Sequence, residues 1–284
     1  MEILIQYAIY LGYSVIAILL LVAMKFSLDF KSKSTYSAAD ELNGNNLALG
    51  FRRTGAYFGL CIAVVGVMYG EASGSLMADM INTVAYGAVG VVYMILALIL
   101  ADKVLISGID NKKAIKDGNV SVGIMEYGVL VATGIIASAS IKLDGGQFYV
   151  SLAYFVIGQL ALFLIVSLYA LRLKKLINIK TAISAGNKSV GIYVCGKFIA
   201  YSLLLHATIY NIDISSNLLS QASQLGAGLA FAVILMTVVE LLIDWLILTK
   251  VTVSDILVKD LYVRSMQLAF IKVGMALILS FTIL

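Results

Sequence analysis

The sequence predicts an all-α integral membrane protein with eight transmembrane helices, and three observations lead to this fold class. The chain has 284 residues, of which 61% are hydrophobic and 13% are charged, and its mean hydropathy is +1.00. Soluble domains are nearer about 45–50% apolar and about 25% charged, so the composition excludes an ordinary soluble enzyme domain. The chain contains no proline, as expected of a protein made mostly of uninterrupted helices.

The third observation is a set of eight apolar stretches, each near the roughly 20 residues that a membrane-crossing helix needs. Four of them are free of charge, and four carry charge near their N-terminal ends. Helices are predicted rather than β-strands because the stretches show no period-2 alternation. In chain order we expect helices at 3–24, 46–70, 80–101, 119–141, 145–171, 187–210, 214–239 and 262–284.

The charges of the connecting loops predict the orientation. Beyond Lys25, which directly follows the first helix, the loops after the first, third, fifth and seventh helices hold twelve basic residues, whereas the other loops hold one, Lys142. Because basic loops stay in the cytoplasm, we expect both termini on the outer side. The twelve basic residues are Lys31, Lys33, Lys103, Lys112, Lys113, Lys116, Arg172, Lys174, Lys175, Lys180, Lys250 and Lys259, and the acidic residues of the other loops are Glu71, Asp79, Asp144 and Asp213.

A repeated motif marks the start of the even-numbered helices. The pattern N-x-[AS]-[LV]-G-x4-G begins at Asn46, Asn119 and Asn187, which are nearly evenly spaced along the chain. The interval between Asn46 and Asn119, applied again after Asn187, reaches Asp260, which we interpret as the start of a degenerate fourth copy. The chain is therefore predicted to contain four two-helix hairpins, grouped as two tandem four-helix repeats at 1–143 and 144–284.

This arrangement resembles the YjfL-like bacterial inner-membrane family. The resemblance rests on Asp102, which closes the third helix, and on the G-N-x-[AS]-[VL] motif that opens the even helices. It implies a bacterial inner membrane and a four-helix unit that occurs singly or in tandem. The family is catalogued as a domain of unknown function, so the resemblance implies no particular activity. The second half departs from the pattern, since Asp260 replaces the Asn, Arg264 replaces the first Gly, and no acid closes the fifth helix.

The even-numbered helices also carry the intramembrane charges. A charge at mid-bilayer costs roughly 2.5–3.5 kcal/mol, so these side chains should face protein or water. We therefore expect an inner ring of even-numbered helices, screened from lipid by the odd ones. Residues i, i+4 and i+7 share a helix face, which predicts a polar stripe toward the centre of the ring. The charges are Arg52, Arg53, Glu126, Lys197 and Lys272, and the stripe is Asn46, Gly50 and Arg53; Asn119, Gly123 and Glu126; Asn187, Gly191 and Val194; and Asp260, Arg264 and Gln267.

Each of these groups also has a structural interpretation. The asparagines stand at helix starts, where Asn caps free backbone N–H groups. Arg53 and Glu126 either neutralise each other or line a pathway. Lys197 and Lys272 have Glu240 as their predicted partner, in a structural pair or in proton or ion handling. The glycines are expected to allow close helix packing, and they are Gly50, Gly55, Gly59, Gly123, Gly128, Gly191 and Gly196.

Two functions fit these features. The first is a channel or carrier for an ion or small polar solute through a central polar stripe, and the alternative is a non-transporting scaffold or partner subunit with structural ion pairs. No enzyme, metal or cofactor is expected, because one histidine and two distant cysteines cannot form the usual zinc clusters and no H-E-x-x-H or G-x-S-x-G motif occurs.

The expected partner is the lipid bilayer, and the basic connectors 109–116 and 174–183 either lie against anionic lipid headgroups or serve only as the positive-inside topology signal. A second copy in a homodimer is also expected from the general preference for two-fold symmetry. The formal net charge of +4 is too small to indicate a nucleic-acid binder.

Overall fold

The computed structural model describes residues 2–68, 74–104, 108, 110–142, 148–248 and 251–283. Over these ranges the regular structure consists of helices, and eight of them are long and apolar enough to cross a membrane, which confirms the predicted fold class. The long helices are α1 (Glu2–Ser32), α3 (Leu47–Met68), α4 (Leu76–Val104), α6 (Val120–Lys142), α7 (Phe148–Leu173), α9 (Lys188–Tyr210), α10 (Leu218–Leu246) and α12 (Tyr262–Ile283). Glu71, Asp144 and Lys250, which entered the orientation argument, lie outside the described residues.

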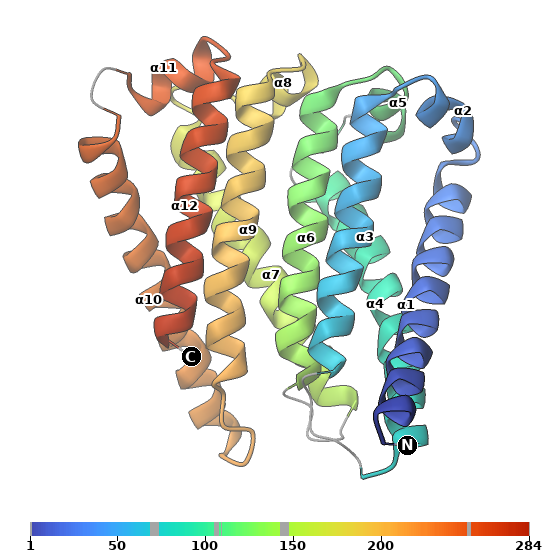
Figure 1. Cartoon of the computed structure of the whole chain (residues 1–284). Helices are drawn as coiled ribbons and strands as arrows, with labels where there is room; N and C mark the ends of the chain where they lie inside the picture. Colours follow the sequence, from blue (N-terminus) through green and yellow to red (C-terminus); the bar gives the residue numbers. More distant parts are fainter. Residues whose placement is uncertain are drawn as a thin grey trace.

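Four short helices lie at one end of the bundle, which we call the connector end (Figure 1). Each precedes the second, fourth, sixth or eighth membrane-crossing helix, which we call the even-numbered crossings. Each short helix is capped at its N-terminus by a Ser, Asp, Asn or Thr side chain. Ile115 and Ile183, on two of these helices, are fully buried in the protein core. The short helices therefore place these two apolar side chains on protein, while Lys113 and Lys116 remain exposed. The short helices are α2 (Ala38–Asn43), α5 (Asn111–Lys116), α8 (Ile179–Ser184) and α11 (Val253–Val258).

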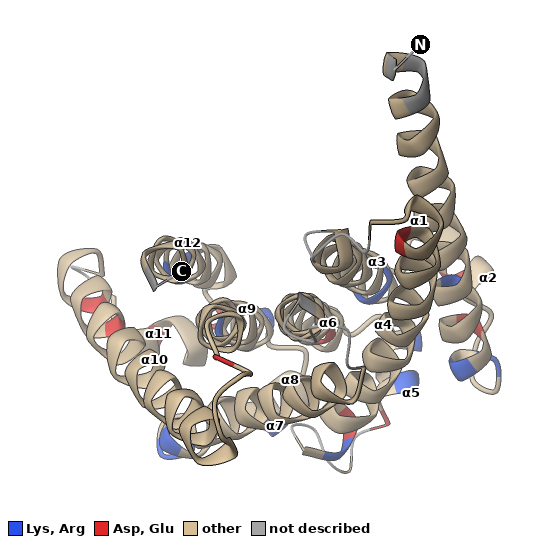
Figure 2. Ribbon diagram, turned by 90° about the horizontal axis from the view of Figure 1, so that it is seen from below, with Lys and Arg blue, Asp and Glu red and all other residues tan. Residues whose placement is uncertain are grey.

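The even-numbered crossings α3, α6, α9 and α12 form an open row and not the predicted ring (Figure 2). α3 packs on α6, α6 on α9, and α9 on α12. The odd-numbered crossings cover one face of this row, with α4 over α3 and α6, α7 over α6 and α9, and α10 over α9 and α12. In the membrane-crossing stretch, 89% of α6 and 72% of α9 is buried, against 17% of α1. The centre of the protein is thus a packed pair of helices.

Glycines hold the row together by allowing contact on opposite sides of each helix. A Cβ at Gly55 would lie 2.6 Å from the Cα of Tyr127, and one at Gly128 would lie 2.5 Å from the Cα of Cys195. Gly196 meets Ala269 in the same way. On the other side of the helices, Gly123 packs against the backbone of Ala48. Each interior helix therefore touches two neighbours with its backbone, which produces a row.

Two of the three remaining predicted packing glycines follow the same geometry. Gly191 packs against Ser121, and Gly59 packs against Leu130. A Cβ at Gly50 would meet nothing within 4 Å, because α3 begins the row and no described helix precedes it. The close-packing interpretation therefore holds for six glycines, and Gly50 is the exception.

The fourth copy of the repeat is shifted by one residue from its predicted register. A residue with positive φ precedes the even helix in every copy, and in the fourth copy it is Asp260, with a φ of 50°. The next residue, Leu261, bonds its N–H to the carbonyl of Ile256, five residues back, as Asn119 bonds that of Ala114. Leu261 therefore takes the place of Asn46, Asn119 and Asn187, and Asp260, Arg264 and Gln267 do not continue the predicted stripe.

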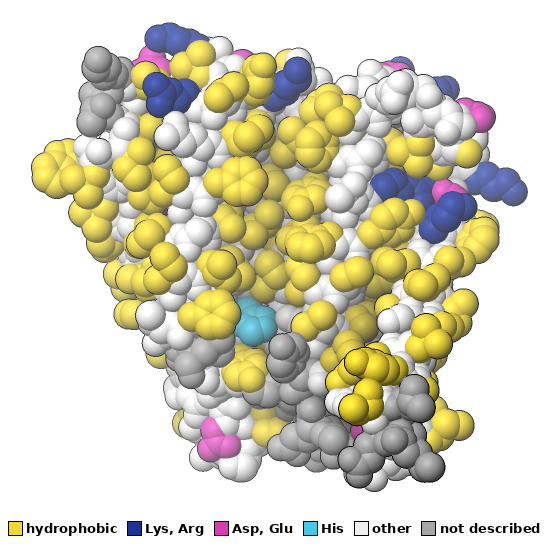
Figure 3. All heavy atoms as spheres, in the orientation of Figure 1, with side chains coloured by type: hydrophobic (Ala, Val, Ile, Leu, Met, Phe, Trp, Pro, Cys, Tyr) yellow, Lys and Arg dark blue, Asp and Glu magenta, His cyan; other side chains and the backbone are white. Residues whose placement is uncertain are grey.

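The row has a second face, opposite the one that α4, α7 and α10 cover. Hydrophobic side chains cover most of this second face (Figure 3). Basic side chains gather toward the connector end of this face. Leu47 and Phe58 on α3 and Phe270 on α12 are among the large exposed apolar residues of the protein. Such an exposed apolar surface matches a lipid environment and would be unusual in a soluble monomer.

Candidate functional site

The corrected register reveals that one acidic residue takes an equivalent place in the two halves, whereas the buried charges do not. Asp102 precedes Asn119 by the same interval as Asp244 precedes Leu261. Each Asp therefore ends the third long helix of its half, at the connector end. Around each of them, side chains from several long helices of that half come together, so the described part of the chain has two charge sites and no single central one.

The first-half charge site contains Lys31, Arg52, Asp102, Asn111 and Glu126, from α1, α3, α4, α5 and α6. The Nε of Arg52 lies 3.2 Å from Oε2 of Glu126, and these side chains are 4% and 0% exposed. Lys31 lies 3.6 Å from Asp102. The amide of Asn111 donates to both carboxylates, at 3.3 Å to Glu126 and in a short bond to Asp102. Two cations and two carboxylates therefore balance each other in a closed network.

Arg53 does not take part in this network, contrary to the predicted pair with Glu126. Its guanidinium contacts Asp29 and donates to the carbonyl of Lys25 at 3.2 Å, both on α1. Neighbouring residues on a helix point about 100° apart, so Arg52 faces α6 while Arg53 faces α1. The predicted pair of Glu126 with Arg53 is therefore wrong, and the adjacent Arg52 is the partner of Glu126.

The second-half charge site contains Lys197, Glu240, Asp244 and Lys272, with Tyr169, Tyr193 and Tyr201. Glu240 on α10 contacts Lys197 on α9 and lies 3.9 Å from Lys272 on α12. The predicted partnership of Glu240 with both lysines is therefore correct. Lys272 also lies 4.0 Å from Asp244, one turn nearer the connector end. The two lysines share two carboxylates, and only the contact between Lys197 and Glu240 is tight.

Aromatic rings surround the ammonium group of Lys197. This group lies 3.6 Å from the centre of the Tyr169 ring, 5.4 Å from that of Tyr193 and 5.7 Å from that of Tyr201. The ammonium group of Lys272 lies 5.3 Å from the same Tyr193 ring. A cation over an aromatic face is stabilised by the electron density of the ring. Tyr193 thus serves both lysines.

The predicted asparagines act as helix caps and also join one hairpin to the next. The Oδ1 of Asn119 accepts from the N–H of Val122, and its amide donates to the carbonyls of Ile183 and Ser184 at 3.0 and 3.1 Å. Asn46 and Asn187 make the corresponding bonds to α5 and α11. These asparagines are structural, and they face their neighbours in the row.

The predicted residues of the fourth copy lie apart from both charge sites. A carboxylate oxygen of Asp260 accepts from the N–H of Ser189 at 2.7 Å, which joins the turn before α12 to α9. Arg264 and Gln267 bond each other at 3.2 Å on the exposed surface. These three residues serve local structure at the connector end.

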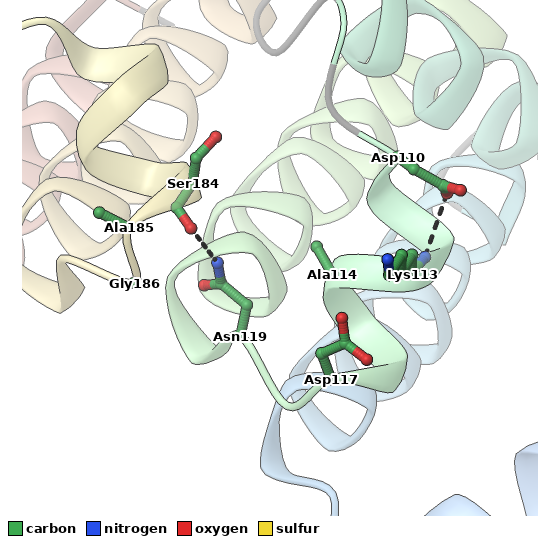
Figure 4. A pocket seen from close by; sticks show the side chains of 8 residues that line it. All are labelled: Asp110, Lys113, Ala114, Asp117, Asn119, Ser184, Ala185 and Gly186. Carbon is green, nitrogen blue, oxygen red and sulfur yellow. Dashed lines mark hydrogen bonds between the residues drawn. The ribbon is translucent and has the colours of Figure 1, made fainter.

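A cavity of about 480 Å³ also opens at the connector end, between α5 and the end of α8 (Figure 4). Its polar groups are used locally. Asp110 caps the N–H of Lys113 at 3.1 Å, and Asn119 points to the carbonyl of Ser184. Within the described residues, no group of three or more His, Cys, Asp or Glu side chains is placed to hold a metal ion. The two charge sites are therefore the stronger candidates.

Sequence reasoning missed several members of these sites. Asp102 and Lys31 entered only as a helix-end marker and an orientation signal, and Asn111, Asp244 and the three tyrosines were not among the predicted site residues. One signal was present, because Tyr193, Lys197 and Tyr201 are spaced by four and therefore share one helix face. The other signal, the equivalence of Asp102 and Asp244, depends on the corrected register.

The fold and the two sites define a multi-pass helical membrane protein built from two tandem four-helix units. Comparison with family models gives the particular family. The description "Domain of Unknown Function (DUF350)" matches the chain twice, over residues 2–141 and 143–283, and the chain belongs to this family. No curated protein and no solved structure matches it.

Proposed function

We propose that the protein conducts or carries an ion or a small polar solute across the membrane, through the second-half charge site. The observation that carries the proposal is a gradient of exposure along this site. The side chain of Asp244 is 38% exposed, that of Glu240 is 11% exposed and that of Lys197 is 3% exposed. Charged groups thus lead from the connector end into the interior, between α9, α10 and α12.

The energetic cost of this arrangement supports a functional role. Ionisable side chains inside a membrane protein are expensive and typically mark the paths of ions, protons or substrates. A structural pair needs one cation and one carboxylate in tight contact, whereas Lys272 lies 3.9 and 4.0 Å from its two carboxylates. A loosely paired lysine near a shared glutamate can change partner when a charged solute enters.

Flux measurements on purified protein in liposomes test the proposal. A panel of inorganic ions and small amines is screened with the wild type, and Glu240→Gln is expected to lower the flux of the conducted species. Asp40→Asn, on the exposed first turn of α2, is the matched control and should leave the flux unchanged. Permeation no faster than through protein-free liposomes, for every species of the panel, contradicts the proposal.

A scaffold or partner subunit is the second candidate, and the first-half charge site favours it. There the cations and carboxylates pair one to one, and Arg52 and Glu126 are almost fully buried. A scaffold predicts that Arg52→Glu combined with Glu126→Arg restores the folding lost in each single variant, without a change in flux. Normal folding of the double variant with a changed flux argues against this candidate.

We further propose that the protein lies in the bacterial inner membrane with its connector end in the cytoplasm, where basic connectors meet anionic lipid. The start of α1 and the end of α12 both point away from the connector end, which fits termini on the outer side (Figure 1). The exposed Lys113 and Lys175 support this orientation. A cysteine is introduced at either position and intact cells are treated with a membrane-impermeant thiol reagent. Labelling of that cysteine contradicts the proposed orientation.

A further inference from the structure

We infer that the second-half charge site binds a monovalent ammonium-type cation at two adjacent positions, entered from the connector end. This inference rests on the proposed function and names the class of its substrate. The two positions are those now held by the ammonium groups of Lys197 and Lys272. Each lysine holds its position when the site is unloaded and moves aside when the substrate enters.

The aromatic walls set the sign of the charge. Lysines and carboxylates are present in equal number, so their charges alone favour neither a cation nor an anion. The rings of Tyr169, Tyr193 and Tyr201, from α7 and α9, lie 3.6–5.7 Å from the ammonium of Lys197. An aromatic face attracts a cation and repels an anion, and cages of such rings are a recurring way to bind ammonium groups. The fixed part of the site therefore fits a cation.

The two positions form a path because they share their surroundings. Glu240 contacts Lys197 and lies 3.9 Å from Lys272, and the Tyr193 ring lies 5.4 and 5.3 Å from the two ammonium groups. The outer position also has Asp244, which is partly exposed. A cation that enters beside Asp244 can thus move one helical turn inward, about 5 Å, and still have the Glu240 carboxylate and the Tyr193 ring beside it.

The resident lysines explain how the empty site is tolerated in a membrane. Removing one partner of a buried pair leaves an uncompensated charge, which is strongly unfavourable. Lys197 supplies the cation that Glu240 needs when no substrate is bound, and an incoming ammonium replaces it in kind. The lysine side chain is long and flexible enough to withdraw, since four carbons separate the ammonium from the backbone.

Binding measurements separate this inference from the proposed function. The unfolding temperature of the purified protein is measured in methylammonium chloride, tetramethylammonium chloride and sodium chloride at equal chloride concentration. Methylammonium is expected to raise it in a saturable manner, because a ligand of the folded state stabilises it. Lys197→Met should bind methylammonium more tightly, since the resident competitor is removed. No saturable shift in either protein overturns the inference.

The aromatic residues supply the matched variants. Tyr169→Leu should weaken the apparent affinity by about thirtyfold, the size expected for one desolvated cation–π contact. Tyr169→Phe keeps the ring and should retain the affinity, and Tyr154→Leu removes another buried tyrosine of α7 and should not change it. Equal affinities in Tyr169→Leu and Tyr154→Leu overturn the inference. Saturable binding without flux refutes only the proposed function, and flux of another species without ammonium binding refutes only this inference.

Discussion

Glu126 on α6 pairs with Arg52 on α3, although Arg53 occupies the position of Glu126 in the repeat. The two arginines are adjacent in sequence and serve different neighbours, since Arg53 contacts Asp29 on α1. The difference in burial of their partners is large, because Glu126 is fully buried and the Asp29 side chain is 32% exposed. The two adjacent arginines therefore contribute unequally to stability.

Arg52→Gln is expected to destabilise the protein far more than Arg53→Gln. The first change leaves Glu126 buried without its cation, which costs about 3–5 kcal/mol. The second leaves Asp29 partly exposed and still 3.2 Å from Lys25, so the cost should be about 0.2–1 kcal/mol. Unfolding of both variants in the same detergent measures the difference. Equal losses would mean that the Arg52 pair is weaker than its burial indicates.

The carboxyl of Asp255, on the short helix α11 outside the membrane-crossing helices, should stay ionised in moderately acidic solution. Bonds from Lys259 and from the hydroxyl and N–H of Thr252 lower its pKa from 3.8 to about 2. A lowered pKa means that the capping contribution is complete above the ordinary value and is lost as the pH falls through about 2. NMR titration of the carboxyl measures this, and a midpoint near 3.8 contradicts the prediction. Lys259→Gln should raise the midpoint.

The number of crossings and the capping asparagines could be predicted because their signals are local. A crossing needs only a long apolar stretch, and the Oδ1 of Asn119 accepts from the N–H of Val122, only three residues further along the chain. The pairing of Glu126 with Arg52 could not be predicted in this way, since adjacent residues on α3 differ by about 100° in direction and spacing alone does not say where α6 lies. Such pairings depend on the relative placement of two helices.

The open row of α3, α6, α9 and α12 was not predicted, although one signal for it was present. Gly123 and Gly128 are five residues apart and so lie about 140° apart around α6. Small residues on nearly opposite sides indicate a helix that touches two neighbours in a line.

The one-residue shift at Asp260 was not visible in the sequence for a different reason. Leu261 stands where the other copies have Asn, so the motif gives no register there, and the register follows only from the positive φ of Asp260.

Gly50 and Gly123 occupy the same position in the repeat and should respond in opposite ways to alanine. At Gly123 the new Cβ would lie 2.7 Å from the Cα of Ala48, and such overpacking costs about 1–3 kcal/mol. At Gly50 the space is open, so Gly50→Ala should be neutral or gain up to about 1 kcal/mol from the better helix propensity of alanine. Thermal unfolding of the two variants tests this. A loss at Gly50 equal to that at Gly123 would imply that another molecule packs against α3.

Asn119→Asp should destabilise the protein at least as much as Asn119→Ala, although Asp is as good a helix cap as Asn. Asp keeps the acceptor for the N–H of Val122 but replaces the donating amide with a carboxylate, which would face the carbonyls of Ile183 and Ser184. The alanine variant loses a cap of about 1 kcal/mol and hydrogen bonds of about 0.5–1.5 kcal/mol each. Leu261→Asn is the control, because the described chain offers no next hairpin for its amide, and it should gain only the cap. Chemical or thermal unfolding ranks the three variants. If Asn119→Asp were as stable as the wild type, the asparagine would act only as a cap, and the bonds between hairpins would contribute nothing to the row.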